Sequence, residues 1–183
     1  MPSDFSIRHA SSIIRQGGIL AYPTDTIYGL GCDPYNPDAV NRLSEIKHRP
    51  LNKLFILLAA DIDQLKGLID IDTEQQDIIA TQKSATSWII SASKTAPEWL
   101  TDNDNNITIR ISQNPVVQKL CRCLGHAIIS SSANLTGKTP AQNSLQIHKY
   151  FHATVDKILA TNKKLTARPS TIIRLSDHTI IRE

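Results

Sequence analysis

The sequence has no apolar run long enough to cross a membrane. A transmembrane helix needs about 20 mostly apolar residues, and no stretch of this 183-residue chain approaches that length. The opening M-P-S-D-F-S-I-R also lacks the basic and then apolar order of a signal peptide. We therefore expect a soluble, cytoplasmic protein that makes no contact with membranes.

Cysteine is also scarce, with three residues in the whole chain. An odd number leaves no complete disulfide framework. Cys121 and Cys123 form a pair without a second cluster at the spacing of zinc ligands, and the histidines are scattered without a ligand pattern. We expect reduced, packed thiols and no metal site made by the protein alone.

Motifs of several common enzyme classes are missing too. The chain contains no H-E-x-x-H, no G-x-S-x-G, no G-x-G-x-x-G after an expected strand, and no dense carboxylate cluster for two metal ions. Gly137-Lys138-Thr139 imitates the end of a Walker A motif, but that motif requires glycine at the position of Ser132. The sequence therefore does not predict a P-loop.

What the sequence does contain is an alternation of apolar strands and helices. With 40% hydrophobic residues it can bury one sizeable core, and we expect one domain over residues 1–183. Short connections predict an α/β fold in which helices cover an open sheet, which is mixed because the last strands adjoin without a helix. The expected strands cover 19–22, 54–59, 88–90, 107–111, 126–129, 155–159, 170–175 and 179–182.

Capping residues mark the starts of the expected helices. Asp4 or Ser6 can cap the first helix. Thr73 and Gln76 have the spacing of a capping box. Two further caps are each followed by a proline, which favours the first helical position: Asn36 and Asn114.

Three polar clusters lie at the ends of expected strands or helices, where a rigid scaffold commonly places working residues. They are Y-P-T-D-T-I-Y-G-L-G-C-D at 22–33, K-H-R-P-L-N-K at 47–53 and S-S-S-A-N-L-T-G at 130–137. Small and hydroxylated residues in the first and third suit a small polar ligand, and the cations of the second can converge on a polyphosphate. A local turn or cations at a helix C-terminus are the structural alternatives.

Taken together and in this order, the clusters resemble the YrdC-like family of threonylcarbamoyl-AMP synthases, and the resemblance extends over essentially the whole chain. It implies an open, twisted α/β sheet with a concave, positively charged face. It also implies condensation of L-threonine, bicarbonate or CO2 and ATP to threonylcarbamoyl-AMP and pyrophosphate. In that family the product serves the t6A modification of adenosine 37 in transfer RNA, through a separate transferase complex.

The resemblance assigns one group of residues to L-threonine. Thr26 lies against the substrate, Tyr28 shapes its pocket and Arg110 forks onto its carboxylate. Ser130 and Ser170 line the same side. From the residues alone, Arg110 would be an ordinary exposed arginine on a strand.

A second group is assigned to ATP, and it gathers the cations of the middle cluster with polar residues from later in the chain. Lys47 and Arg49 are also the expected catalytic residues, because they neutralise the phosphates. Mg2+ is implied through the ATP phosphates, since the motifs offer few carboxylates of their own. The whole group is Lys47, Arg49, Lys53, Ser132, Asn134 and Arg182.

The sequence departs from the family pattern between the second and third clusters. The family carries a tryptophan followed by P-G-P and a threonine there, whereas this chain reads Q-K-S-A-T-S-W at 82–88. The missing prolines and glycine remove a rigid turn beside the expected nucleotide site. We expect Ser87 to replace the threonine hydroxyl and Lys83 to add a phosphate contact.

Two alternative functions stay open from the sequence. The formal charge of +3 permits an RNA-binding module, but 5% aromatic residues offer no stacking platform. The altered segment at 82–88 also leaves room for a paralogue of the same fold that uses another substrate. Direct contact with transfer RNA is compatible with the enzyme as well.

Overall fold

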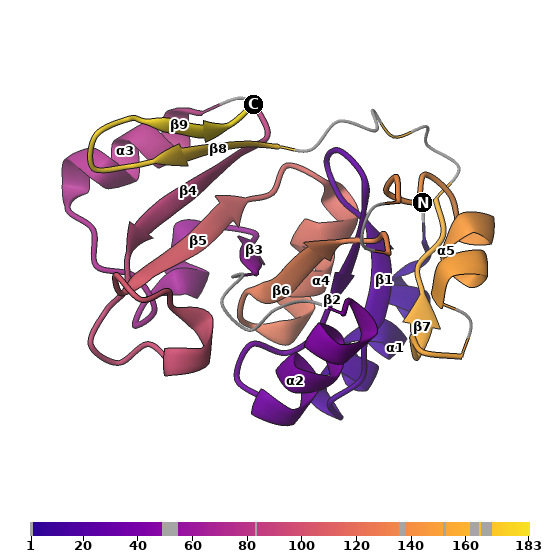
Figure 1. Cartoon of the computed structure of the whole chain (residues 1–183). Coiled ribbons are helices and arrows are strands. Elements are labelled where there is room, and N and C mark those ends of the chain that lie inside the picture. The colour runs from indigo at the N-terminus through magenta and orange to yellow at the C-terminus, as the bar shows by residue number, and fades with distance from the viewer. Residues whose placement is uncertain are drawn as a thin grey trace.

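The computed structural model describes residues 2–48, 55–82, 84–135, 138–151, 153–161, 165 and 170–183. Its strands form a nine-stranded sheet in the order β7-β1-β2-β6-β3-β5-β4-β8-β9 (Figure 1). The strands are β1 (Leu20–Pro23), β2 (Tyr28–Gly31), β3 (Ile56–Ala59), β4 (Thr86–Ser91), β5 (Asn106–Ile111), β6 (Ile128–Ser132), β7 (Lys157–Ile158), β8 (Thr171–Arg174) and β9 (Ile180–Arg182).

Parallel and antiparallel pairs both occur in this sheet. β3 pairs parallel with β5, and β4 pairs parallel with β8. β6 pairs antiparallel with β2 on one side and with β3 on the other. The last two strands, β8 and β9, form an antiparallel pair. The prediction of a mixed α/β sheet is therefore confirmed.

Helices pack on both faces of the sheet. They are α1 (Asp4–Arg15), α2 (Pro37–Ile46), α3 (Thr73–Thr81), α4 (Pro115–Leu124) and α5 (Ser144–Phe151). Residues of α1 and α4 share one buried cluster with Leu58 of β3, whereas residues of α2 and α5 share another with Leu57. Because consecutive strand residues point to opposite faces, these clusters are the cores on the two sides of the sheet.

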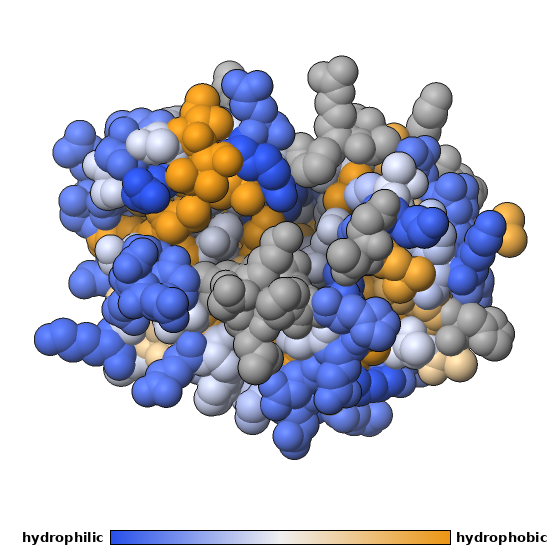
Figure 2. Space-filling model, in the orientation of Figure 1, coloured by the Kyte–Doolittle hydropathy of each residue, from blue (hydrophilic) through white to orange (hydrophobic). Residues whose placement is uncertain are grey.

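The outer surface of the sheet end at β9 is partly apolar. Ile180 and Ile181 are about half exposed there, and Figure 2 shows apolar side chains gathered over this part of the molecule.

Within the described ranges, no helix has the length and apolar character that crossing a membrane requires.

Two helix starts differ from the sequence expectation. Ser3 caps α1, since its hydroxyl accepts a hydrogen bond from the Ser6 amide at 3.2 Å, so the expectation of Asp4 or Ser6 is wrong. The capping box of α3 is made by Asp72 and Gln75, one residue before the expected pair. The caps of α2 and α4 are confirmed: Asn36 and Asn114.

The first polar cluster contains a strand that the sequence analysis did not predict. β2 pairs with β1 as an antiparallel hairpin, and all of its residues are buried. Glycine and polar residues are uncommon in strands, so the sequence did not indicate one here. The close approach of β6 nevertheless requires glycine at position 31. A Cβ atom on Gly31 would lie 2.0 Å from the carbonyl oxygen of Ile129 in β6. β6 also continues to Ser132, beyond its expected end at 129, so the serines of the third cluster belong to a strand.

We predict that Gly31→Ala lowers the free energy of unfolding by about 3 kcal/mol, because β2 and β6 must separate to admit a methyl group. Gly125→Ala is the matched comparison. Gly125 has a φ of 84° but no atom within 4 Å of an added Cβ, so backbone strain alone costs about 1 kcal/mol. Urea denaturation measures both variants, and equal losses of stability would contradict the close approach at Gly31.

Candidate functional site

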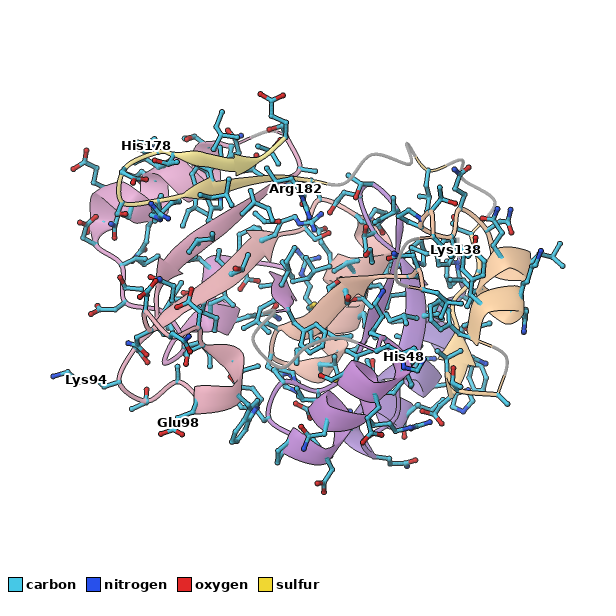
Figure 3. All side chains as sticks on the ribbon, viewed as in Figure 1. His48, Lys94, Glu98, Lys138, His178 and Arg182 are labelled. Atoms are coloured by element: carbon cyan, nitrogen blue, oxygen red, sulfur yellow. The ribbon has the colours of Figure 1, made fainter. Side chains whose placement is uncertain are left out.

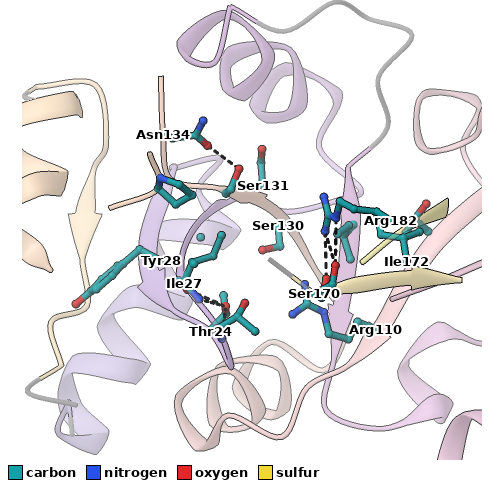
Figure 4. Close-up of a pocket in the computed structure, with 16 residues that line it drawn as sticks. Thr24, Ile27, Tyr28, Arg110, Ser130, Ser131, Asn134, Ser170, Ile172 and Arg182 are labelled. Carbon is teal, nitrogen blue, oxygen red and sulfur yellow. Dashed lines mark hydrogen bonds between the residues drawn. The ribbon is translucent and has the colours of Figure 1, made fainter. Parts of the chain in front are cut away.

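A cavity of about 440 Å³ opens on the sheet beside the β1–β2 hairpin (Figure 4). Its floor follows a row of cross-strand neighbours, which are Ser130 of β6, Ile56 of β3 and Thr108 of β5. Ile56 is two residues from Leu58, so this row faces the same side of the sheet as α1 and α4. The cavity therefore begins where the apolar packing of that face gives way to hydroxyl side chains.

The turn of the β1–β2 hairpin forms one wall. The Thr24 hydroxyl donates to the carbonyl oxygen of Ile27 at 2.7 Å, which closes the turn from within. Thr24, Thr26 and Tyr28 all border the cavity. The Tyr28 hydroxyl accepts a hydrogen bond from the Thr161 amide at 3.1 Å. The local-turn interpretation thus holds for Thr24, and Thr26 also borders the cavity. The ring of Tyr28 instead packs in the buried cluster shared with α2 and α5, and Figure 4 shows it pointing away from the cavity.

Arg110 on β5 brings a buried positive charge to the cavity. The residue is 5% exposed, so the alternative of an ordinary exposed arginine is wrong. Its Nε and Nη1 atoms have no hydrogen-bond partner among the described residues. Burial lowers the pKa of Arg110, the charge of Asp25 opposes that shift, and the charge of Arg182 adds to it. Such a group is stabilised by an anion, and its planar fork suits a carboxylate.

Asp25, at the tip of the hairpin, lies near Arg110 without a hydrogen bond to it. Its Oδ2 atom is 4.0 Å from Arg110 Nη1 and accepts a hydrogen bond of 2.7 Å from the Ser112 hydroxyl. Asn114, the cap of α4, donates from Nδ2 to the carbonyl oxygen of Thr24 at 2.7 Å. The hairpin tip is therefore fixed to the end of β5 and to the start of α4.

The end of β6 forms another wall, and Lys47 holds it. The Lys47 ammonium donates to the carbonyl oxygens of Ser132 and Asn134, and to Oδ1 of Asn134 at 3.2 Å. The Ser132 hydroxyl donates to the same Oδ1 at 2.6 Å. Lys47 follows α2 directly and is 6% exposed. Residues from the second and third clusters, far apart in the sequence, are thus in contact.

The C-terminal strands close the remaining side. Arg182 on β9 donates from Nε and Nη2 to the carbonyl oxygen of Ser170, at 3.1 and 2.8 Å. Figure 3 shows Arg182 directed toward the middle of the sheet, and Figure 4 shows Ser170 between Arg182 and Arg110. The Ser170 hydroxyl bonds with that of Ser87 at 3.0 Å. Ser87 is completely buried, so its hydroxyl holds Ser170 in place.

The structure brings most of the expected site residues together. The residues expected to bind threonine, together with part of the ATP group, border the cavity: Thr26, Tyr28, Arg110, Ser130, Ser170, Ser132, Asn134 and Arg182. Lys47 is joined to this group through Ser132 and Asn134. Arg49, Lys53 and Lys83 lie outside the described residues. The role of each residue toward a substrate remains a prediction.

The sequence analysis missed several cavity residues, although the alternation of residues along one strand could have revealed Thr108. The alternation at 107–111 puts Thr108 and Arg110 on one face of β5 and the core isoleucines on the other. No local signal pointed to Ile56 or Ile172, because their positions depend on the register of β3 and β8 with their neighbours. The cavity residues that were missed are Thr24, Ile27, Gly29, Ile56, Thr108, Ser131, Pro140 and Ile172.

The thiols and other metal-binding groups do not form a site in the described part of the chain. No group of three or more His, Cys, Asp or Glu residues there could hold a metal ion. Cys32 and Cys121 are buried, and burial raises the pKa of each thiol to about 12. Cys123 is exposed, so the expectation that all three thiols are packed is wrong at this position.

Known proteins share this arrangement over the length of the chain. A family model named Sua5_yciO_yrdC, described as telomere recombination, matches residues 12–183. The chain belongs to the Sua5/YciO/YrdC family. A threonylcarbamoyl-AMP synthase of Xanthomonas euvesicatoria is 35% identical over 187 residues, with 100% of both chains covered. Another from Pseudomonas aeruginosa is 37% identical over 184 residues, covering 100% of this chain and 99% of the relative.

Solved structures of the Sua5/YciO/YrdC family have the same fold. YciO of E. coli has a TM-score of 0.88 at 28% identity, with 100% of this chain and 91% of YciO covered. Sua5 of P. abyssi, complexed with L-threonine, has a TM-score of 0.89 at 26% identity. The match covers 97% of this chain but 53% of Sua5, so the chain spans about half the length of that protein. The predictions of the family, the twisted sheet and a threonylcarbamoyl-AMP synthase are confirmed, and the alternative functions are not favoured.

We predict that the double variant Asp25→Asn/Arg110→Met raises the free energy of unfolding by about 1 kcal/mol, because it removes both members of a buried charge pair together with two N–H groups that lack acceptors. Arg42→Met is the matched comparison. Arg42 pairs with Asp156 at 2.7 Å near the surface, and its loss lowers stability by about 0.5 kcal/mol. Urea denaturation measures both. A larger loss for the double variant than for Arg42→Met would mean that the fold, and not a ligand, requires this buried charge pair.

Proposed function

We propose that the cavity beside the β1–β2 hairpin is the active site of this threonylcarbamoyl-AMP synthase, in which L-threonine, bicarbonate or CO2 and ATP condense to threonylcarbamoyl-AMP and pyrophosphate. The observation that carries the proposal is the buried Arg110 guanidinium, whose Nε and Nη1 lack partners among the described residues at a cavity lined by hydroxyls. Full-length relatives named threonylcarbamoyl-AMP synthase support it, as does the Sua5 structure with L-threonine.

Arg110 receives the carboxylate of L-threonine. A carboxylate offers two oxygen atoms, and the guanidinium fork can donate to both. Thr26, Ser130 and Ser170 contribute hydroxyls around the same space, and Ile56 and Ile172 contribute apolar contacts. A pocket that combines a few placed polar groups with apolar contacts is suited to a small hydroxylated amino acid.

The nucleotide binds on the side of the cavity that the end of β6 forms. Lys47 supports this placement, because its buried ammonium contacts Ser132 and Asn134. To reach a phosphate, Lys47 exchanges one carbonyl partner for a phosphate oxygen. The residues that bind ATP in this proposal are Lys47, Arg49, Lys53, Ser132, Asn134 and Arg182.

The chemistry consists of two steps. The amine nitrogen of threonine forms a C–N bond with CO2, releasing a proton, or with bicarbonate, releasing water, and a carbamate results. A carbamate oxygen then attacks the α-phosphorus of ATP, and the bond to pyrophosphate breaks. The protein holds the reactants in line and neutralises the phosphate charge. Lys47 and Arg49 are the catalytic residues for that neutralisation.

Mg2+ enters with the nucleotide and is held mainly through the ATP phosphates. This ion prefers oxygen ligands and usually keeps several waters beside substrate phosphates. The described residues provide no cluster of ligands that could hold a metal alone. In this proposal the phosphate oxygens of ATP and bound waters are the main ligands of the ion.

The product is a mixed anhydride of a carbamate and a phosphate, so an acceptor must take the threonylcarbamoyl group before water does. A threonylcarbamoyl transferase complex is the proposed acceptor partner, acting at adenosine 37 of transfer RNA in the cytoplasm. Direct contact between this chain and transfer RNA is compatible with that role. The whole chain, 1–183, acts as one YrdC-like domain.

Pyrophosphate release by the purified protein tests the proposal. In the presence of ATP and Mg2+, release should require both L-threonine and bicarbonate. Mass spectrometry should then detect threonylcarbamoyl-AMP as the nucleotide product. Release that does not depend on threonine, or AMP as the sole nucleotide product from the start of the reaction, would contradict the proposal.

We predict that Lys47→Ala lowers kcat/KM for pyrophosphate release by about 100-fold, because the phosphates lose one neutralising cation. Lys66→Ala is the control, since Lys66 is an exposed lysine paired with Asp63 and its removal changes the net charge equally. Circular dichroism and the melting temperature establish that both variants fold. Full activity in Lys47→Ala would disprove its assignment to the phosphates.

A further inference from the structure

Asp25 lies in the middle of the first polar cluster, yet it is not among the residues that line the cavity. Its neighbours Thr24 and Thr26 border the cavity, whereas the Asp25 carboxylate bonds with Ser112 at the end of β5. The side chain is 12% exposed. Burying a carboxylate is costly unless it is paired or hydrogen-bonded, so the position of Asp25 needs a physical reason.

Ser112 fixes one oxygen of this carboxylate. Ser112 is completely buried, and its hydroxyl donates to Asp25 Oδ2 at 2.7 Å. The same hydroxyl oxygen accepts a hydrogen bond from the Asn114 amide at 3.2 Å. Gln118 of α4 donates to the Ser112 carbonyl oxygen at 3.0 Å. Asp25 is therefore attached, through Ser112, to the first turns of α4.

Asp25 and Arg110 lie close enough to attract each other but form no hydrogen bond. Asp25 Oδ2 is 4.0 Å from Arg110 Nη1, which is too far for a hydrogen bond but close enough for Coulomb attraction in a buried site. The charge of Asp25 favours the ionised form of Arg110 against the effect of burial on its pKa. Because the hydrogen bond to Ser112 holds Oδ2 at this distance, Arg110 keeps the Nε and Nη1 hydrogens for another acceptor.

We propose that Asp25 is a positioning residue for recognition of the substrate carboxylate. It supplies the counter-charge that holds Arg110 at the cavity wall, and Ser112 holds the carboxylate too far from Arg110 to take the hydrogens that Arg110 offers to the ligand. This inference rests on the proposed function, in which Arg110 binds the carboxylate of threonine. Asp25 therefore acts on threonine binding and not on nucleotide binding.

Asp25→Asn separates charge from hydrogen bonding, because the amide oxygen can still accept from Ser112. We expect KM for L-threonine to rise about tenfold, as for the loss of one partner of a close charge pair, while kcat and KM for ATP stay unchanged. Ser112→Ala retains the charge but frees Asp25 to bond with Arg110, so KM for L-threonine should also rise. Asp63→Asn is the control, since it removes an exposed carboxylate and should change neither constant.

A spectroscopic readout distinguishes positioning from a general structural role. In 15N-labelled protein, the Nε–H resonance of Arg110 is assigned by its disappearance in Arg110→Met. Asp25→Asn should shift this resonance in protein without threonine, and Asp63→Asn should leave it unchanged. Calorimetric titration with L-threonine in the absence of ATP gives the binding affinity independently of turnover.

The outcomes distinguish a failure of the role proposed for Asp25 from a failure of the proposed function. If the wild-type protein binds threonine and Asp25→Asn has the same affinity, KM and Arg110 resonance, the inference is wrong and the proposed function stands. If the wild-type protein neither binds threonine nor releases pyrophosphate, the proposed function is wrong, and the role of Asp25 that rests on it is wrong too. If Asp25→Asn raises KM for threonine and KM for ATP equally and lowers the melting temperature, Asp25 stabilises the fold and does not position Arg110. If Asp25→Asn does not fold, Ser112→Ala decides by the same measurements.

Discussion

Arg110 is a charged side chain that the fold removes from water almost completely, and its surroundings are organised around that burial. It is 5% exposed, and two of its N–H-bearing nitrogen atoms lack partners in the described structure. Desolvating such a group costs several kcal/mol, which Asp25 at 4.0 Å offsets in part. An anionic ligand would supply the missing acceptors. The arrangement is therefore unfavourable for folding and favourable for binding, as is common in functional sites.

The sheet brings this charge together with segments that are far apart in the sequence. β5 carries Arg110, the β1–β2 hairpin carries the threonines, β6 carries the serines, and β9 contributes Arg182. Helix ends fix the same elements in place. Asn114 caps α4 and also holds the hairpin turn through Thr24, and Lys47 at the end of α2 holds the end of β6. The positions of the site residues thus depend on the caps as much as on the strands.

Local patterns in the sequence predicted the α/β fold, the resemblance to the family supplied half of the cavity residues, and the failures have physical causes. Proline after Asn36 and Asn114 marks two helix starts without ambiguity, whereas several polar residues compete to cap α1. β2 was missed because close strand packing requires Gly31, a residue that ordinarily argues against a strand. Thr108 could have been found from alternation with Arg110. The burial of Arg110 and its distance from Asp25 could not, because both depend on how the hairpin packs against β5.

Calorimetric titration with L-threonine and with L-threoninol, in which an alcohol replaces the carboxylate, tests the central role of Arg110 most directly. The two ligands share the amine and the side chain and differ only in the group assigned to the guanidinium. If Arg110 binds the carboxylate, L-threonine should bind at least about 100-fold more tightly than L-threoninol, because the alcohol leaves the buried charge unpaired. Equal affinities would contradict that assignment and, with it, the explanation of why a charged side chain is buried beside the cavity.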